Sequence, residues 1–267
     1  MKSQLLLEEM TRVDANNAAD ANSLLVWPMG AIEQHGPHLP VGTDTFIVEH
    51  LAREAAKDAK KEIPIVVAPT LPFGSSDHHL PFGGTMSLST QLFYQTVTEI
   101  AESLIKSKFK RMYLVNSHGG NHELLQLVAR DLALKHDVSI ASASYWTVAW
   151  NELTDMDAHV NRRLPGHAGS FETSVILALK PKLVKEPLPS RESVESTDPR
   201  GFGRPVRAEH SGSWLKINGY SDSPKNADVE NGNKWINTTV KALSKSCLLY
   251  TSPSPRDRTR SRMPSSA

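Results

Sequence analysis

The chain has 267 residues, of which 39% are hydrophobic and 22% charged, proportions typical of a soluble globular protein. Its formal net charge is +1, and because four arginines and one aspartate give residues 247–267 a charge of +3, residues 1–246 carry −2. A mildly acidic body argues against nucleic-acid binding through a basic patch. The single cysteine, Cys247, excludes a disulfide framework and thiolate metal sites in the body. With no apolar run of signal-peptide or membrane-span length, we expect a cytoplasmic protein without a membrane partner.

Elements of alternating type follow one another along most of the chain. Short apolar segments rich in β-branched or aromatic residues predict buried strands, and longer segments with one apolar face predict helices. In chain order, the predicted elements are a strand at 23–30, a helix at 45–60, a strand at 63–69, a helix at 89–107, a strand at 111–117, a helix at 121–135, a strand at 138–145, and helices at 170–180 and 224–245. This alternation predicts an α/β fold, with a mostly parallel sheet covered on both faces.

Two segments in the last third of the chain have an unusual composition. Residues 185–213 contain several prolines, few apolar residues and charges of both signs, and they predict a long loop rather than a domain boundary. After Ser246 the sequence becomes rich in Ser, Pro and Arg and loses its periodicity, which resembles translated vector sequence more than a natural C-terminus. We therefore expect residues 1–246 to form a single domain and residues 247–267 to be a disordered, non-native tail.

Polar loops follow the predicted strands at their carboxyl ends. The first of them, AIEQHGPHLPVGTD at residues 31–44, mixes potential metal ligands with four glycines and prolines. The candidate residues on these loops are Glu33, His35, Asp44, Asp77, His78, His79, His118, His167 and Glu172. Because the carboxyl ends of parallel strands meet at one edge of a sheet, we expect these side chains to face a common crevice.

The residue types on these loops predict a metal site with nitrogen and oxygen ligands. Glu33 and His35 are two positions apart, so in an extended chain they project on the same side. Asp44 follows at a helix start, where its carboxylate can bridge two ions. Imidazole and carboxylate groups without sulfur suit Zn²⁺, Mn²⁺ or Fe²⁺. For these three residues together with His118, chance clustering is the weaker explanation.

Other candidate residues have simpler explanations, which the sequence leaves open. Glu172 lies in the first turn of a predicted helix, where a carboxylate is favourable for dipole reasons alone. The pair His78 and His79 could order a turn or form the wall of a substrate pocket. We expect His38 to face solvent or to cap a helix.

Four motifs together resemble the creatininase (creatinine amidohydrolase) family, in the family's order along the chain: WPMGAIEQHGPHLPVGTD, FGGTMSLS, VNSHGGN and GHAGSFETS. The resemblance implies a three-layer α/β/α sandwich, a centre of two divalent metal ions with Zn²⁺ first among them, and a homo-oligomer, often a hexamer. It implies Asp44 as the bridging ligand and His167 as the catalytic histidine. The implied metal ligands are Glu33, His35, Asp44, His118 and Glu172. The expected substrate contacts are His78, His79 and Asn121.

Two glycines depart from the pattern expected of members that hydrolyse creatinine. In those members, which this chain resembles, a glutamate ligand stands two residues after the strand-end histidine. This chain has Gly120 at that position. They also have a glutamate directly before the catalytic histidine, where this chain has Gly166. Creatinine itself is therefore not the expected substrate. The same family includes formamide deformylases, a peptidase that trims a peptide-derived cofactor, and other cyclic-amide hydrolases.

The expected function is metal-dependent hydrolysis of a C–N amide bond in a small-molecule substrate. A metal-activated water would be the nucleophile, and His167 would carry the proton to the departing nitrogen. The alternative is a non-catalytic metal- or small-molecule-binding protein, whose coordination sphere would leave no place for water. The sequence disfavours a phosphate- or dinucleotide-handling enzyme and a nucleophilic-serine hydrolase, because it has none of the motifs G-x-x-x-x-G-K-[ST], G-x-G-x-x-G and G-x-S-x-G.

Overall fold

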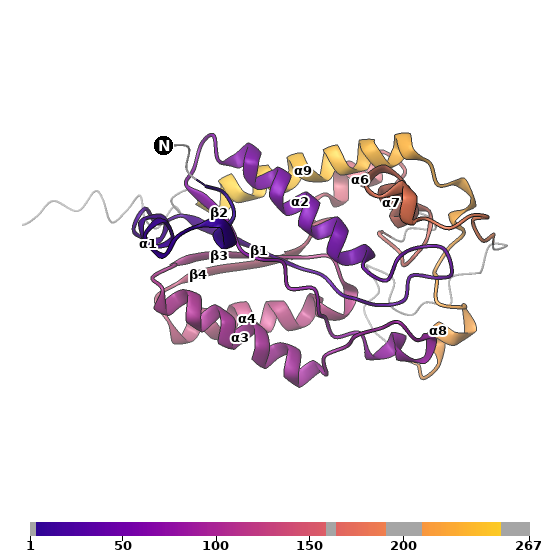
Figure 1. The fold of residues 1–267 in the computed structure, drawn as a ribbon, viewed down its shortest axis with the longest axis horizontal. Helices are drawn as coiled ribbons and strands as arrows, with labels where there is room; N and C mark the ends of the chain where they lie inside the picture. Colours follow the sequence, from indigo (N-terminus) through magenta and orange to yellow (C-terminus); the bar gives the residue numbers. More distant parts are fainter. Residues whose placement is uncertain (1–3, 159–163, 191–209, 252–267) are drawn as a thin grey trace, which may run out of the picture.

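A parallel sheet forms the middle of the molecule, whose computed structural model describes residues 4–158, 164–190 and 210–251 (Figure 1). The strands are β1 (Leu24–Met29), β2 (Ile65–Val67), β3 (Arg111–Asn116) and β4 (Ser139–Ser144). Their order across the sheet is β2-β1-β3-β4, and each neighbouring pair is parallel. All four carboxyl ends therefore reach the same edge of the sheet.

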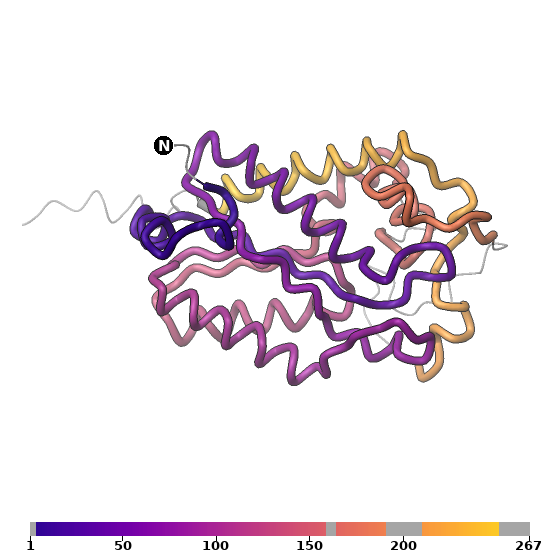
Figure 2. Tube along the Cα trace, viewed as in Figure 1, coloured from indigo at the N-terminus to yellow at the C-terminus, as the bar shows by residue number. Residues whose placement is uncertain are grey.

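Helices cover both faces of this sheet, because the central strand β1 directs apolar side chains to both of them. Leu24 and Val26 belong to one core cluster, and Leu25, Trp27 and Met29 belong to the other. The helices over the first face are α2 (Thr43–Ala59), α7 (Ser170–Leu179) and α9 (Val229–Thr251), and those over the second are α3 (Thr90–Lys106) and α4 (His122–Lys135). Figures 1 and 2 show the two helical layers above and below the sheet. The predicted three-layer α/β/α sandwich is confirmed.

Shorter elements complete the described part of the chain. They are η1 (Leu7–Glu9), α1 (Arg12–Asp20), η2 (Asp77–Phe82), η3 (Gly119–Asn121), α5 (Tyr145–Val148), α6 (Trp150–Asp155), η4 (Pro181–Leu183), α8 (Ser213–Lys216) and η5 (Pro224–Asn226). Helix α1 was not predicted, because its only buried residue is Ala19 and its apolar pattern is weak. Its start is nevertheless encoded locally, since Thr11 and Asp14 form a reciprocal capping box.

The last helix runs further than its predicted range of 224–245. Helix α9 continues to Thr251, and Cys247 is only 2% exposed in the core shared with α2 and α7. The predicted boundary after Ser246 therefore falls inside a helix, because apolar side chains beyond it still meet the core. Residues 252–267 lie outside the described residues.

Two further predictions concern length. Strand β2 covers only three residues of the predicted range 63–69. The predicted loop at 185–213 falls mostly on residues 191–209, which lie outside the described part of the chain. Among the described helices, none is both long and apolar enough to cross a membrane.

Candidate metal centre

Five acidic and histidine side chains meet at the carboxyl edge of the sheet. Their positions are Glu33 and His35 in the loop after β1, Asp44 in the first turn of α2, His118 two residues after β3, and Glu172 in the first turn of α7. All five are at most 3% exposed. The structure thus brings the five predicted metal ligands into one buried cluster.

The Asp44 carboxylate lies between the two histidines. Its Oδ1 is 3.4 Å from His35 Nε2, and its Oδ2 is 3.4 Å from His118 Nδ1. Glu172 Oε2 lies 3.7 Å from His35 Nε2, and Glu33 Oε2 lies 3.2 Å from His118 Nδ1. Two ligand atoms that are each about 2.1 Å from one cation lie roughly 3.4 Å apart in a tetrahedral site. The spacing therefore fits two neighbouring cation sites that share Asp44.

Backbone carbonyls determine which nitrogen of each imidazole faces this cluster. His35 Nδ1 donates to the Glu33 carbonyl at 3.1 Å, so Nε2 is the nitrogen that faces the cluster. His118 Nε2 donates to the Ser75 carbonyl at 3.0 Å, so Nδ1 is the nitrogen that faces the cluster. Histidine ligands of metals usually donate their other N–H in this way.

Several polar atoms of the cluster have no hydrogen-bond partner among the described residues. They are Glu33 Oε2, His35 Nε2 and Asp44 Oδ2, all with essentially no exposed surface. A buried polar atom without a partner costs free energy. Cations bound between these atoms would remove that cost, so the donors present fit a metal centre.

Without cations, this cluster holds protons. Burial opposes a charge on His35, but the neighbouring carboxylates, led by Asp44, outweigh it and raise the pKa of His35 to about 10. Burial raises the pKa of Glu172 to about 8, against the effect of His35. Burial also opposes a charge on His118, but Glu33 and Asp44 raise its pKa well above the usual value. Cations that bind here must displace these protons.

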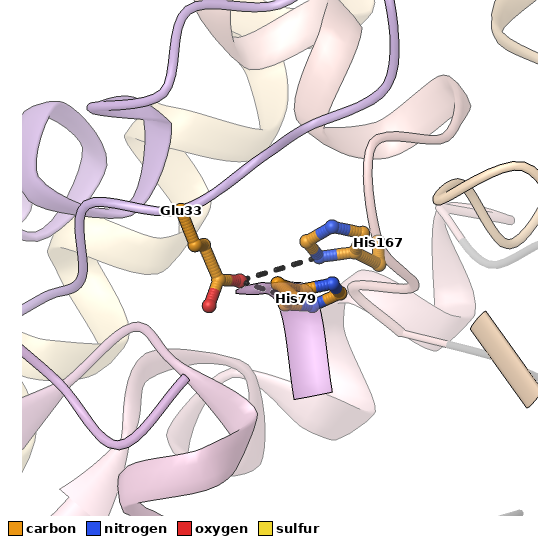
Figure 3. Close-up of side chains that lie close together, drawn as sticks. All are labelled: Glu33, His79 and His167. Atoms are coloured by element: carbon orange, nitrogen blue, oxygen red, sulfur yellow. Dashed lines mark ion pairs between the residues drawn. The ribbon is translucent and has the colours of Figure 1, made fainter. Parts of the chain in front are cut away.

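His167, the predicted catalytic histidine, lies beside Glu33 of the cluster (Figure 3). Its Nδ1 is 3.6 Å from Glu33 Oε1, and its ring stacks on His79 with the centroids 4.3 Å apart. Trp214 of α8 packs edge-on against the same ring at 5.0 Å. Burial, followed by the neighbouring imidazoles of His35 and His79, lowers the pKa of His167 well below its usual value. The imidazole is therefore neutral near pH 7 and able to accept a proton.

The two adjacent histidines of η2 occupy different surroundings. His78 is exposed, and its ring lies parallel to that of His118 with the centroids 5.7 Å apart. His79 is only 1% exposed, and its Nε2 lies 3.5 Å from Glu33 Oε1 (Figure 3). The exposed ring lies where a substrate could meet it, whereas His79 lies inside the cluster.

Two polar side chains differ from their predicted surroundings. Asn121 was expected to contact substrate, but it is fully buried, its Oδ1 accepts the Ser75 N–H and its Nδ2 donates to the Gly30 carbonyl, each at 3.0 Å. It therefore ties together two loops of the site. His38 was expected to face solvent or cap a helix, but it is 1% exposed and its Nε2 is hydrogen-bonded to Thr173 Oγ1 at 2.9 Å.

The two departing glycines leave no room for a side chain. A Cβ at Gly120 would lie 2.6 Å from His118 Nε2 and even closer to the Ser75 carbonyl oxygen. Gly166 has a φ of +76°, and a Cβ there would lie 2.8 Å from Asp222 Oδ2. Glutamates at these two positions would require the surrounding groups to move, so their absence is part of how this site is packed.

Gln34 and Trp214 belong to the site but were not predicted. The Gln34 side-chain nitrogen lies 2.8 Å from His79 Nδ1, and the Trp214 ring lies 4.7 Å from the His79 ring. An amide is not a typical metal ligand, so Gln34 stands out only through its place between Glu33 and His35. Trp214 lies on a four-residue helix without any periodic pattern, and the sequence carries no signal that would have identified it.

The chain is similar to known proteins in both sequence and fold. The creatininase family model, described as creatinine amidohydrolase, matches residues 8–247. The mycofactocin precursor peptide peptidase of Mycobacterium tuberculosis (strain CDC 1551 / Oshkosh) is 32% identical over 186 residues, which span 66% of this chain and 66% of that relative's length. A crystal structure of creatinine amidohydrolase (creatininase) superposes with a TM-score of 0.75 at 25% identity, covering 94% of this chain and 99% of that chain. A structure described as Creatininase Mn gives a TM-score of 0.73 at 25% identity, covering 94% of this chain and 100% of that chain.

Proposed function

The chain belongs to the creatininase family, and from this premise we propose that it is a metal-dependent hydrolase of C–N amide bonds in small substrates. The observation that carries the proposal is the position of the Asp44 carboxylate, 3.4 Å from a nitrogen of His35 on one side and of His118 on the other. Each of those nitrogens faces the cluster and is available to a cation once its proton is displaced, because the other nitrogen of the ring donates to a backbone carbonyl. This is the arrangement that two ions with a shared carboxylate require.

We propose two divalent cations as cofactors, with Zn²⁺ first, and Mn²⁺ or Fe²⁺ as substitutes. The first would be held by His35, Asp44 and Glu172, and the second by His118, Asp44 and Glu33. Nitrogen and oxygen donors without thiolate suit these ions, and one similar structure is described as Creatininase Mn. Bound cations lower the pKa of a coordinated water and polarise a carbonyl oxygen, which is the chemistry that they would supply.

His167 is proposed as the residue that carries the proton. Its Nε2 donates to the Gln34 backbone carbonyl at 2.9 Å, which leaves Nδ1 as the acceptor next to the cluster. From this position the imidazole takes a proton from the nucleophile and returns it to the departing nitrogen. Trp214 and His79 pack against the ring and limit the access of water to it.

The proposed substrates are cyclic amides, formamides and related small molecules rather than creatinine. Gly120 and Gly166 have no space for the glutamates expected of creatinine-hydrolysing members. Peptidase activity on a peptide-derived substrate is the second candidate, because a relative with 32% identity is named a mycofactocin precursor peptide peptidase. A panel of lactams, formamides and short peptides separates these classes.

The test compares two histidine variants. His118→Ala should lose bound metal and activity together. His167→Ala should keep its metal content, measured by plasma mass spectrometry, while its turnover on the best substrate falls about a hundredfold or more. The control is His136→Ala at the end of α4, since His136 contacts Glu102 away from the cluster and its removal should change neither quantity.

Two outcomes would contradict the proposal. Full turnover in His167→Ala would remove the proton-carrying role from that residue. Stoichiometric metal binding with no hydrolysis of any substrate in the panel would favour the non-catalytic alternative, and absorption spectra of the Co²⁺-substituted protein would then report a filled coordination sphere.

We also propose that the protein is a homo-oligomer, with a hexamer as the expected count. Three apolar side chains of the described surface, Leu80, Met86 and Leu215, are 50%, 57% and 55% exposed. Contact between subunits would remove such side chains from water. Light scattering of the purified chain tests the count, and a monomer at micromolar concentration would contradict it. The proposed location is the cytoplasm, in line with a chain that has a single cysteine.

A further inference from the structure

The side chain of Gln34 is the meeting point of several parts of the site. It follows the predicted ligand Glu33 in the chain and is only 6% exposed. The amide nitrogen lies 2.8 Å from His79 Nδ1, 3.0 Å from His167 Nε2 and 2.8 Å from the Gly219 carbonyl oxygen. The amide oxygen accepts the Gly36 N–H at 2.9 Å, which fixes the orientation of the amide.

Counting protons assigns a role to each atom in this network. The amide nitrogen of Gln34 has two hydrogens, and one of them must go to the Gly219 carbonyl, which can only accept. The Gln34 backbone carbonyl can also only accept, and His167 Nε2 lies 2.9 Å from it. His167 therefore carries its hydrogen on Nε2. The second amide hydrogen of Gln34 is then donated to His79 Nδ1.

The other neutral tautomer of His167 fits these groups less well. If His167 Nε2 accepted from the Gln34 amide, the Gln34 backbone carbonyl would lose this donor and His79 Nδ1 would lose the amide hydrogen. Burial makes such mismatches costly. With Nδ1 accepting, a neutral His79 carries its hydrogen on Nε2, which lies 3.5 Å from Glu33 Oε1.

We propose that Gln34 is a positioning residue that makes His79 a hydrogen-bond donor and His167 a proton acceptor toward the same point of the metal centre. The two rings are stacked at an angle of 13°, and His79 Nε2 and His167 Nδ1 lie 3.5 and 3.6 Å from the same oxygen, Glu33 Oε1 (Figure 3). Hydrolysis of an amide needs an acceptor for the proton of the nucleophile and a donor toward the developing charge on oxygen. His167 supplies the first and His79 the second.

The loop that contains Gly219 is shaped around this amide. Gly219 has a φ of +73°, and a Cβ there would lie 2.8 Å from Gln34 Cδ, so only glycine allows the amide to approach its carbonyl. The same loop holds the backbone of His167, since the His167 N–H donates to Ser221 Oγ and the Ser221 N–H donates to the His167 carbonyl, both at 2.8 Å. Gln34 is thus linked to the acceptor histidine through side chain and backbone.

Nuclear magnetic resonance of the zinc-loaded full chain, labelled with ¹⁵N-histidine, tests the proposal directly. Long-range ¹H–¹⁵N correlations distinguish the two neutral tautomers, and His79→Asn and His167→Asn assign the signals. We expect both residues to carry the hydrogen on Nε2 in the unsubstituted protein. A hydrogen on Nδ1 of either ring would overturn the proposal. This measurement does not depend on whether a variant at position 34 folds.

The variant Gln34→Glu keeps the shape of the side chain but replaces the amide donor with an acceptor. We expect the hydrogen of His79 to move to Nδ1, with metal content unchanged, kcat lowered at least about tenfold and KM changed less than about twofold. The matched control is Gln126→Glu, because the exposed Gln126 amide of α4 contacts His122 Nε2 at 3.0 Å, away from the cluster. If the His79 tautomer in Gln34→Glu were that of the unsubstituted protein, Gln34 would be a packing residue only.

The kinetic part of this test rests on the proposed hydrolase function, whereas the spectra do not. Unchanged spectra with normal activity would overturn the role of Gln34 and leave the hydrolase intact. The expected spectra in a protein that hydrolyses nothing would support Gln34 and contradict the proposed function.

Discussion

The apolar layers and the metal centre are equally buried but held together by opposite means. Leu132 of α4 and Asp44 are each 2% exposed, yet the first lies among apolar side chains and the second among charges. Removing apolar surface from water stabilises the fold directly. Burying carboxylates and imidazoles is costly unless each finds a partner. The comparison indicates that apolar burial stabilises the sheet and its helices, whereas the buried charges at the edge of the sheet need protons or cations as partners.

The largest expected effect comes from removing the charge that the two proposed cations share. Asp44→Asn should abolish detectable hydrolysis and lower metal content at both sites, because the amide keeps the shape but not the charge of the ligand. Added Zn²⁺ should raise the melting temperature of the unsubstituted protein through binding to the folded state, but not that of the variant. Plasma mass spectrometry and thermal unfolding followed by circular dichroism measure both effects.

The same variant also tests how the buried charges are compensated once a chelator has removed the cations. Without cations, the protonated imidazoles of His35 and His118 are the charged partners of Asp44, so Asp44→Asn should lower the melting temperature of the chelated protein at neutral pH. A chelated variant as stable as the chelated unsubstituted protein would show that these histidines hold no protons in the absence of cations.

A substitution in the apolar layer should give the reverse result. Leu132→Ala leaves a cavity in the cluster formed by α3, α4 and one face of the sheet. The free energy of unfolding should fall by about 2–5 kcal/mol, while metal content and turnover per folded molecule stay unchanged. Urea titration gives the first quantity. A large loss of metal in this variant would show that the two regions are not separable.

The dependence of metal binding on pH sharpens the electrostatic side of the comparison. In the cation-free protein His35, with a pKa of about 10, and Glu172, with a pKa of about 8, hold protons across the range from pH 6 to 8. Bound cations displace these protons, so affinity rises as pH rises, by about tenfold per pH unit for each proton displaced. The affinity for Zn²⁺ at pH 8 should exceed that at pH 6 by at least about a hundredfold. Competition with a chelating dye measures it, and a flat profile would contradict the assignment of these ligands.

The sequence predicts the layers well because their signal is periodic. Every strand of the observed sheet lies within a predicted range, and α2, α3, α4 and α7 lie within about two residues of theirs. Helix α1 escaped prediction because it buries only Ala19, and local capping rather than periodicity defines it. Where burial on one face is weak, the pattern that identifies a helix is weak as well.

The site was predictable in composition but not in its internal contacts. Glu33, His35 and Asp44 are visible because three ligand types in a loop after a buried strand are unusual. The use of Asn121 as a tie between loops, and of Gln34 as a partner of the histidines, depends on contacts between segments far apart in the chain. Amide side chains serve so many purposes that their type alone does not indicate which one applies.

The smallest expected effect concerns the end of α9, where the sequence misleads about the boundary of the domain. Cys247 is buried, and Leu248 and Tyr250 pack against the core shared with α2 and α7. A chain truncated after Ser246 should therefore be less stable than a chain truncated after Thr251, by on the order of 1–2 kcal/mol for the apolar surface exposed. The pair of truncations isolates residues 247–251, because both lack everything that follows. Equal urea midpoints for the two would mean that the last turns of α9 add nothing to the layer and that the domain ends where its composition changes.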